Sequence, residues 1–319
     1  MKQRLVETDG LRQQVWEAGE GPLVILCHGF PELGWSWRRQ LPALADAGFR
    51  ALAPDMRGYG GTDKPQAIDA YTILHLVGDM IDLVRSQDET EAVIVGHDWG
   101  APVAWAAALL RPDVFRGVAG LSVPFTPRRP GRPPIPTWRS IVKAQNLGQF
   151  YMLSFLEEGV EAEFMADVPG ALRKAFYAYD GATPDAERST GFHPEDISFL
   201  ESLWTPKTLP AWLDEEELKP YVEAFERSGF SGPLNWYRNL DRNWALTAFA
   251  QDLPIIVPGM FMVGEKDPVR NYTGHAAAEL KTWVPNLKSH VVVPDAGHWI
   301  QQEKPEIVNA ALIAFLRGL

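Results

Sequence analysis

The sequence predicts an α/β protein in which a mostly parallel sheet carries helices on both faces and is interrupted by a helical insertion. Two observations support this prediction. Short apolar runs typical of buried strands alternate with amphipathic helical segments in the first part of the chain and return near its end. Between them lies a long stretch with helical periodicity and no such run.

Composition excludes several classes of protein. The chain has 319 residues, of which 46% are hydrophobic, so it can bury a substantial core. A net charge of −11 repels phosphate backbones and argues against nucleic acid as a partner. No apolar run is long enough to span a membrane, and the N-terminus lacks the apolar region of a signal peptide. A single cysteine, Cys27, excludes an internal disulfide and suits a cytoplasmic location.

The first part of the chain begins with a predicted hairpin. Residues 6–8 and 13–16 flank Asp9-Gly10, a strong turn signal. The continuous apolar run 23–27 then predicts a buried strand. The elements expected next are a helix over 37–47, a strand over 50–53, a helix over 72–85, a strand over 92–95, a helix over 99–110 and a strand over 118–123.

The alternation of strands and helices ends at a proline-dense linker, residues 127–136. From there to about residue 245 the pattern is helical. Strand-like runs return at 255–257, 261–263 and 291–293, and a last helix is expected over 305–316. We therefore predict a core formed by 1–126 and 246–319 and a helical lid, or cap, formed by 127–245.

Gly96-His97-Asp98-Trp99-Gly100 has the pattern of a nucleophile elbow, a sharp turn between a strand and a helix. Positions two residues either side of the nucleophile must be small, because larger side chains would collide in the turn. An aspartate at the centre is ionised at neutral pH without help from a base. It suits attack on an sp³ carbon to give an ester. The alternative is that Asp98 only caps the following helix.

The loop after the strand 23–27 reads His28-Gly29-Phe30-Pro31. In folds with a nucleophile elbow, this loop and the residue after the nucleophile supply the oxyanion hole. The predicted donors are the backbone N–H groups of Phe30 and Trp99, and we assign His28 a structural role.

A catalytic base is expected after the last strand, where Asp295-Ala296-Gly297-His298-Trp299 offers His298. The acid that orients it is expected after an earlier strand. Asp267 is favoured there, with Glu265 as a minor alternative, because the loop after the strand 118–123 holds no carboxylate. The other reading of Asp267 is a turn aspartate before a proline.

Motif residues follow one another along nearly the whole chain. They are His28-Gly29-Phe30-Pro31-Glu32 with Ser36-Trp37-Arg38, Asp55-Met56-Arg57-Gly58-Tyr59-Gly60, the elbow, Glu265-Lys266-Asp267 and Gly297-His298-Trp299. Each motif also occurs in other hydrolases, but the ordered set resembles the soluble epoxide hydrolases of the α/β-hydrolase superfamily. The resemblance implies an α/β-hydrolase fold and hydrolysis of epoxides to diols through an ester on Asp98.

The same resemblance implies two lid tyrosines that donate hydrogen bonds to the epoxide oxygen. Tyr237 lies in Asn-Trp-Tyr-Arg-Asn, residues 235–239, which matches the family closely. Tyr151 precedes a Glu-Glu-Gly turn in which Glu158 stands where the family usually has proline. Without the resemblance, both tyrosines would read as amphipathic lid residues.

No dinucleotide fingerprint, P-loop, HExxH or CxxC motif occurs, so neither a cofactor nor a metal is expected. The expected partners are water and a small apolar or aromatic epoxide. Two alternatives stay open: a haloalkane dehalogenase that uses the same Asp98, Asp267 and His298, and a catalytically inactive small-molecule receptor on the same fold.

Overall fold

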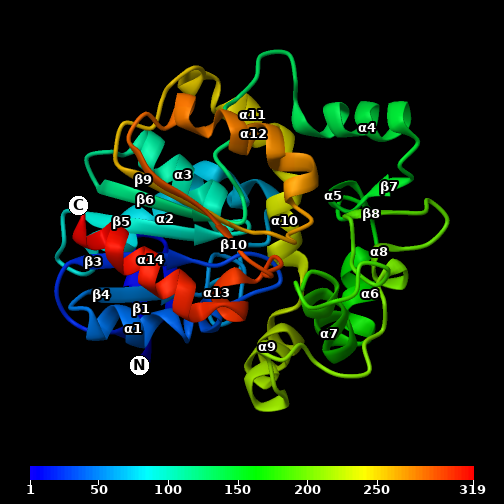
Figure 1. Ribbon diagram of the computed structural model, residues 1–319, viewed down its shortest axis with the longest axis horizontal. Helices are drawn as coiled ribbons and strands as arrows, with labels where there is room; N and C mark the ends of the chain where they lie inside the picture. The colour runs from blue at the N-terminus through cyan, green and yellow to red at the C-terminus, as the bar shows by residue number, and fades with distance from the viewer.

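The computed structural model describes residues 1–319. At its centre is an eight-stranded sheet with the order β1-β2-β4-β3-β5-β6-β9-β10 (Figure 1). The first two strands form an antiparallel hairpin, β2 pairs antiparallel with β4, and all remaining pairs are parallel. The predicted mostly parallel sheet is confirmed. The strands are β1 (Lys2–Thr8), β2 (Leu11–Ala18), β3 (Leu23–Cys27), β4 (Arg50–Pro54), β5 (Ala92–His97), β6 (Phe115–Leu121), β9 (Gly259–Gly264) and β10 (Leu287–Val293).

Each face of the sheet is covered by helices and has its own hydrophobic core. Successive side chains of β3 point to opposite faces, so Leu23 and Ile25 join one core and Val24 and Leu26 join the other. Burial of one such side chain contributes about 1.5–3 kcal/mol. The helices α1 and α14 cover one face, and α2, α3 and α12 cover the other. The helices outside the insertion are η1 (Gly34–Trp37), α1 (Gln40–Asp46), η2 (Ile68–Tyr71), α2 (Ile73–Arg85), α3 (Gly100–Leu110), α12 (Arg270–Trp283), α13 (Ile300–Glu303) and α14 (Pro305–Arg317).

The segment between β6 and β9 is helical, as predicted, and lies to one side of the sheet (green to yellow in Figure 1). It also contains one small two-stranded antiparallel sheet that the sequence did not predict, because its strands are only two residues long. Its elements are α4 (Pro134–Gln145), β7 (Gln149–Phe150), α5 (Tyr151–Ser154), α6 (Val160–Ala166), α7 (Val168–Ala178), β8 (Phe192–His193), α8 (Phe199–Ser202), α9 (Glu215–Ser228), α10 (Ser231–Arg238), α11 (Leu240–Leu246) and η3 (Ala248–Ala250).

One predicted strand, residues 255–257, is wrong. This segment has no regular secondary structure and joins no sheet, and the next strand begins at Gly259. Prolines stand on either side of it, at positions 254 and 258, and a proline cannot donate to a strand ladder. Ile255 is nevertheless buried, which explains the apolar signal.

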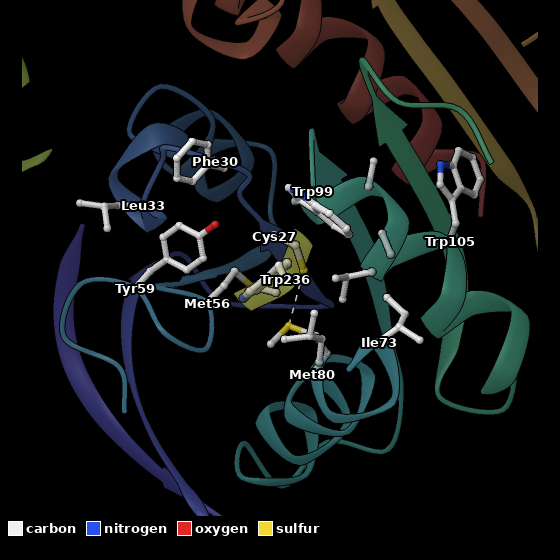
Figure 2. Close-up of a cluster of buried hydrophobic side chains, with 14 of the residues drawn as sticks. Cys27, Phe30, Leu33, Met56, Tyr59, Ile73, Met80, Trp99, Trp105 and Trp236 are labelled. Atoms are coloured by element: carbon white, nitrogen blue, oxygen red, sulfur yellow. Dashed lines mark hydrogen bonds between the residues drawn. The ribbon is translucent and has the colours of Figure 1, made fainter. Parts of the chain in front are cut away.

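The helix α10 of the insertion is held closely against the rest of the chain. The indole N–H of Trp236 donates to the carbonyl oxygen of Arg57 at 3.1 Å. The backbones of Gly58 and Gly232 approach so closely that a Cβ on Gly232 would lie 2.5 Å from the Gly58 carbonyl oxygen. In Figure 2, Trp236 reaches the buried cluster that holds Trp99, and their ring centroids are 5.9 Å apart. The insertion therefore shares a core with the sheet.

The cysteine thiol lies in the same buried cluster. Cys27 is fully buried, and its sulfur lies 3.5 Å from that of Met80 (Figure 2). Burial raises the pKa of the thiol, so the thiolate is disfavoured. None of the helices combines the length and apolar character needed to cross a bilayer.

Candidate active site

Asp98 occupies the turn between β5 and α3. Its φ is +49°, a left-handed conformation that is uncommon for residues other than glycine. The two glycines of the motif are required by packing, because a Cβ on Gly96 would lie 2.0 Å from the Gly100 carbonyl oxygen. A Cβ on Gly100 would lie 2.1 Å from that of Cys27. The turn therefore has the geometry expected of a nucleophile elbow, and no side chain caps the N-terminus of α3.

The loop after β3 approaches Asp98 from the other side. The backbone N–H of Phe30 donates to Asp98 Oδ1 at 2.8 Å. Gly29 makes this approach possible, because a Cβ there would lie 2.3 Å from the Asp98 carboxylate. The other predicted donor, the N–H of Trp99, makes no hydrogen bond to Asp98 here. His28 accepts the N–H of Met56 at 2.9 Å, which fits a structural role.

His298 lies between two carboxylates. Its Nδ1 is 3.1 Å from both carboxylate oxygens of Asp267, and its Nε2 is 3.3 Å from Asp98 Oδ2. A carboxylate only accepts hydrogen bonds, so the Nδ1 proton belongs to the contact with Asp267. The alternative acid, Glu265, instead accepts the N–H of Asp295. The structure thus brings Asp98, His298 and Asp267 together and leaves Glu265 outside.

The charges of this triad support one another. Burial alone would raise the pKa of Asp98, but the hydrogen bond and charge of His298, the charge of His97 and the N–H of Phe30 lower it below its ordinary value. Burial would likewise lower the pKa of His298, yet Asp267 and then Asp98 raise it well above its ordinary value. The Asp98 carboxylate is therefore ionised at neutral pH.

The two predicted lid tyrosines line the same cavity as this carboxylate. Tyr151 begins α5 and Tyr237 lies near the end of α10, and both line a cavity of 40 Å³ together with Asp98 and His298. Burial, and after it nearby groups that include Asp98, raise the pKa of each phenol well above its ordinary value. Both hydroxyls therefore keep their protons at neutral pH.

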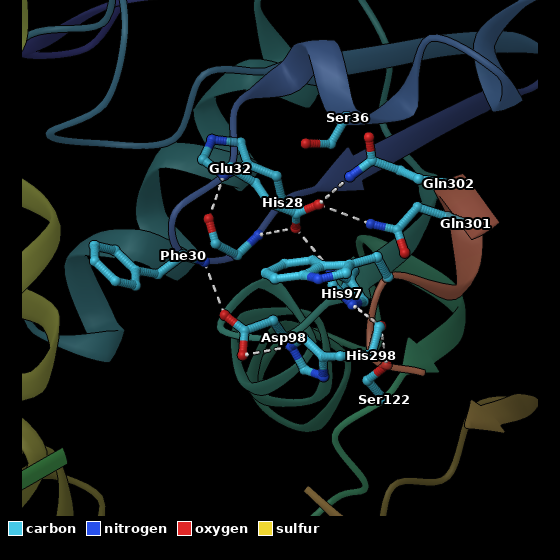
Figure 3. A network of polar contacts seen from close by, with 12 residues as sticks. His28, Phe30, Glu32, Ser36, His97, Asp98, Ser122, His298, Gln301 and Gln302 are labelled. Carbon is cyan, nitrogen blue, oxygen red and sulfur yellow. Dashed lines mark hydrogen bonds and ion pairs between the residues drawn. The ribbon is translucent and has the colours of Figure 1, made fainter. Parts of the chain in front are cut away.

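Sequence reasoning missed a buried polar network behind the site (Figure 3). Glu32 and His97 are both fully buried and share a hydrogen bond of 2.7 Å. His97 Nε2 also contacts the carbonyl oxygen of His298 at 2.8 Å. Burial would raise the pKa of Glu32, but the charge and hydrogen bond of His97 lower it. The amides of Gln301 and Gln302 donate to the other Glu32 oxygen, so the network joins the Phe30 loop to the His298 loop.

A larger pocket of 490 Å³ also reaches Asp98. Its wall combines residues of the core with residues of the insertion. No group of three or more histidine, cysteine, aspartate or glutamate side chains is arranged to hold a metal ion. The lining is rich in apolar and aromatic side chains, among them Trp99, Trp105, Leu109, Phe125, Trp138 and Met152.

The sheet order, the elbow and the triad define a hydrolase of the α/β-hydrolase class. A family profile described as alpha/beta hydrolase fold matches residues 22–305. The chain is 46% identical to epoxide hydrolase A of Mycobacterium tuberculosis, with 99% of this chain and 98% of that protein covered. It is 39% identical to epoxide hydrolase 3 of Siraitia grosvenorii, with 98% and 96% covered.

Solved structures give the same result. An epoxide hydrolase from an endophytic Streptomyces matches with a TM-score of 0.94 and 42% identity, over 99% of this chain and 95% of that one. Epoxide hydrolase A of Mycobacterium thermoresistibile matches with a TM-score of 0.92 and 46% identity, over 100% and 98%. The chain belongs to the epoxide hydrolases of the α/β-hydrolase fold. The predicted family, fold and enzyme class are confirmed.

Replacing Gly100 with alanine should lower the free energy of unfolding by at least about 2 kcal/mol, because the added methyl group overlaps the Cys27 carbonyl. Denaturant unfolding measures this loss. Gly78→Ala in α2 is the matched control, because a Cβ there meets nothing within 4 Å. The control should be neutral or more stable by up to about 1 kcal/mol. Equal stability of the two variants would show that the elbow tolerates the methyl group.

Replacing Asp267 with asparagine should lower the pKa of His298, because Asp267 contributes most to the rise that opposes burial. The imidazole resonances followed by NMR across pH measure this change. Glu265→Gln should leave the titration unchanged, since Glu265 bonds elsewhere. A His298 pKa that stays the same in Asp267→Asn contradicts the assigned pairing.

Proposed function

We propose that this chain converts epoxides to vicinal diols through a covalent hydroxyalkyl ester on Asp98, which water activated by His298 and Asp267 then hydrolyses. One observation carries the proposal. The carboxylate of Asp98 shares a small cavity with His298 and with two protonated phenols, Tyr151 and Tyr237. A nucleophile, a base and two acids thus surround one space that a three-membered ring could enter.

In the first half of the reaction, an Asp98 oxygen attacks one epoxide carbon while the bond from that carbon to the ring oxygen breaks. The departing oxygen carries a developing negative charge and needs a proton. Tyr151 and Tyr237 face it from the lid side, and one of them gives its proton while the other donates a hydrogen bond. Their raised pKa keeps the phenols protonated and available.

In the second half, water attacks the ester carbonyl and His298 Nε2 accepts a proton from that water. The carbonyl oxygen becomes an oxyanion, which the N–H of Phe30 stabilises; Trp99 supplies the second donor if its N–H turns toward this oxygen. The intermediate then expels the alcohol oxygen, which takes the remaining proton of the attacking water, so the diol leaves and Asp98 is again a carboxylate. The proton held by His298 returns to the tyrosine that gave up its own. The charges favour this order, because Asp98 is one of the groups that raise the pKa of His298. Esterification removes that charge and lowers the pKa of His298, so the imidazole can give up its proton and take the neutral form that accepts a proton from water.

The pocket supports a small apolar or aromatic epoxide as the substrate. The 490 Å³ space beside Asp98 has mostly apolar walls that favour an uncharged substituent. The segment 127–245 serves as the lid, since it supplies both phenols while 1–126 and 246–319 supply the triad. A cytoplasmic location agrees with a free, buried Cys27.

The paired phenols favour an epoxide over a haloalkane as the substrate. A halide leaves without a proton, so a dehalogenase has no use for two acids at this position. A complete nucleophile, acid and base likewise argue against an inactive receptor.

Replacing His298 with glutamine should trap the ester, because attack by Asp98 needs no base whereas hydrolysis does. The rate of hydrolysis should fall by about 100-fold or more. Intact-protein mass spectrometry after mixing with styrene oxide should show one added substrate mass, on the peptide containing Asp98. The parent enzyme, assayed for diol formation, is the positive control. Normal turnover by the variant, or binding without an adduct, would falsify the assigned role of the base.

Removing the phenol oxygens should slow ester formation rather than hydrolysis. Tyr151→Phe and Tyr237→Phe should each reduce the single-turnover rate of ester formation, and the double variant should lose about 100-fold or more. Stopped-flow tryptophan fluorescence follows this step. Tyr71→Phe, whose hydroxyl donates to Pro65, is the control. A double variant with the parent rate contradicts the role of both tyrosines, and a loss in only one single variant assigns the acid to that residue alone.

A further inference from the structure

The lid meets the His298 loop at a close backbone joint. The N–H of His298 donates to the carbonyl oxygen of Tyr179, which lies in the turn after α7, at 2.8 Å. Gly181 of this turn and Gly297 of the His298 loop are in close contact, because a Cβ on either glycine would lie 2.4 Å from the amide nitrogen of the other. A displacement of the lid turn therefore moves the backbone that carries the base.

The carboxylate of Glu303 holds this joint together. One oxygen accepts the N–H groups of Gly297 at 2.8 Å and Gly181 at 3.0 Å, and the other accepts that of Trp299 at 2.9 Å. Two of these donors lie directly before and after His298, and the third belongs to the lid. Glu303 ends α13, and the mechanism proposed above assigns it no role.

A second carboxylate, Asp180, lies beside Glu303. Asp180 belongs to the lid turn, is 4% exposed and accepts the indole N–H of Trp212 at 3.1 Å. Burial first, and then the charge of Asp180 and a hydrogen bond with it, raise the pKa of Glu303 to about 8, although the N–H groups of Gly297 and Gly181 act in the opposite direction. Two neighbouring carboxyl groups do not both ionise easily, because the negative charge of one opposes the loss of a proton from the other.

We propose that Glu303 is a positioning residue for His298. A proton shared between Glu303 and Asp180 keeps the lid turn after α7 joined to the His298 loop. The inference rests on the proposed role of His298 as base. When the pair holds one proton, the two carboxyl groups attract one another and the joint stays closed. When that proton is lost, two anions face each other across the joint, and the backbone around His298 loses its fixed position.

The expected pH dependence follows from this pair. The rate of ester hydrolysis should fall as pH rises through about 8, where Glu303 releases its proton. Stability changes in the same direction. The unfolded chain releases the Glu303 proton near the ordinary pKa of 4.5, whereas the folded state keeps it up to about pH 8. The free energy of unfolding therefore declines between pH 4.5 and about 8 and levels off at higher pH. The other charged groups around the pair are Arg39, Arg188, Asp295, Lys304 and Glu306.

Glu303→Gln tests the positioning role. The amide has one accepting oxygen instead of two, so ester hydrolysis should slow by roughly 10- to 100-fold, while the rate of ester formation stays near that of the parent. Single-turnover kinetics with styrene oxide separate these two rates. Glu306→Gln, which removes an exposed carboxylate at the start of α14, is the matched control and should change neither rate.

Asp180→Asn tests the shared proton and remains informative if Glu303→Gln folds poorly. The asparagine amide can donate permanently to Glu303, so the variant should keep full hydrolysis at pH 7. Its falling limb near pH 8 should disappear, because an ionised Glu303 then faces no second anion. The decline in unfolding free energy between pH 4.5 and about 8 should flatten, because the pKa of Glu303 falls without the charge of Asp180.

The outcomes separate this inference from the proposed function. If His298→Gln fails to trap the ester, the role of the base is wrong. If His298→Gln traps the ester but Glu303→Gln hydrolyses it at the parent rate, the positioning role alone is wrong. If Asp180→Asn retains the parent falling limb near pH 8, the shared proton is wrong.

Discussion

The close packing of three backbone segments around Asp98 is the constraint on which the rest of the site depends. The elbow, the loop after β3 and the end of that strand approach within distances that no Cβ would allow at Gly29, Gly96 or Gly100. This contact places the Phe30 N–H 2.8 Å from the carboxylate and turns the Asp98 side chain into the cavity. A nucleophile held in a left-handed conformation is costly by itself, so the surrounding core must supply the stability that maintains it.

The charges of Asp98 and His298 are set against one another, and this balance changes during the reaction. His298 lowers the pKa of Asp98, and Asp267 and Asp98 raise the pKa of His298. Ester formation removes one charge from this set and so alters the basicity of the imidazole without any movement of the chain. Glu32 and His97 form a separate buried pair behind the triad, which fixes the backbone of the His298 loop rather than exchanging protons with substrate.

Local sequence pattern predicted the parts of this molecule that depend on local rules. The buried strands, the elbow and the end of the chain in a helix from Pro305 follow from periodicity, small residues and turn chemistry. The error at 255–257 arose because burial of Ile255 mimics a strand where flanking prolines prevent pairing. Glu32 and Glu303 could not be assigned from the sequence, because their partners come from distant segments and the partner groups are largely backbone amides. The convergence of Tyr151 and Tyr237 was available only through resemblance, since helical periodicity does not say which face of an inserted helix meets the nucleophile.

The catalytic side chains come from both the core and the insertion, so their alignment depends on the joint at Glu303. Asp98 is fixed by the sheet, so its position is independent of the lid, whereas the two phenols are carried by α5 and α10. His298 belongs to the core by sequence but is bonded to the lid through the Tyr179 carbonyl, and Trp299 beside it donates to the carbonyl oxygen of Phe176 in α7. The base is therefore bonded to the lid that carries the acids as well as to the core that carries the nucleophile. A lid displaced from the core would misplace the phenols and the imidazole together while leaving Asp98 poised. Both halves of the reaction thus depend on one interface. Glu303 bonds only at the His298 end of it, so this carboxylate influences ester hydrolysis without touching the ester.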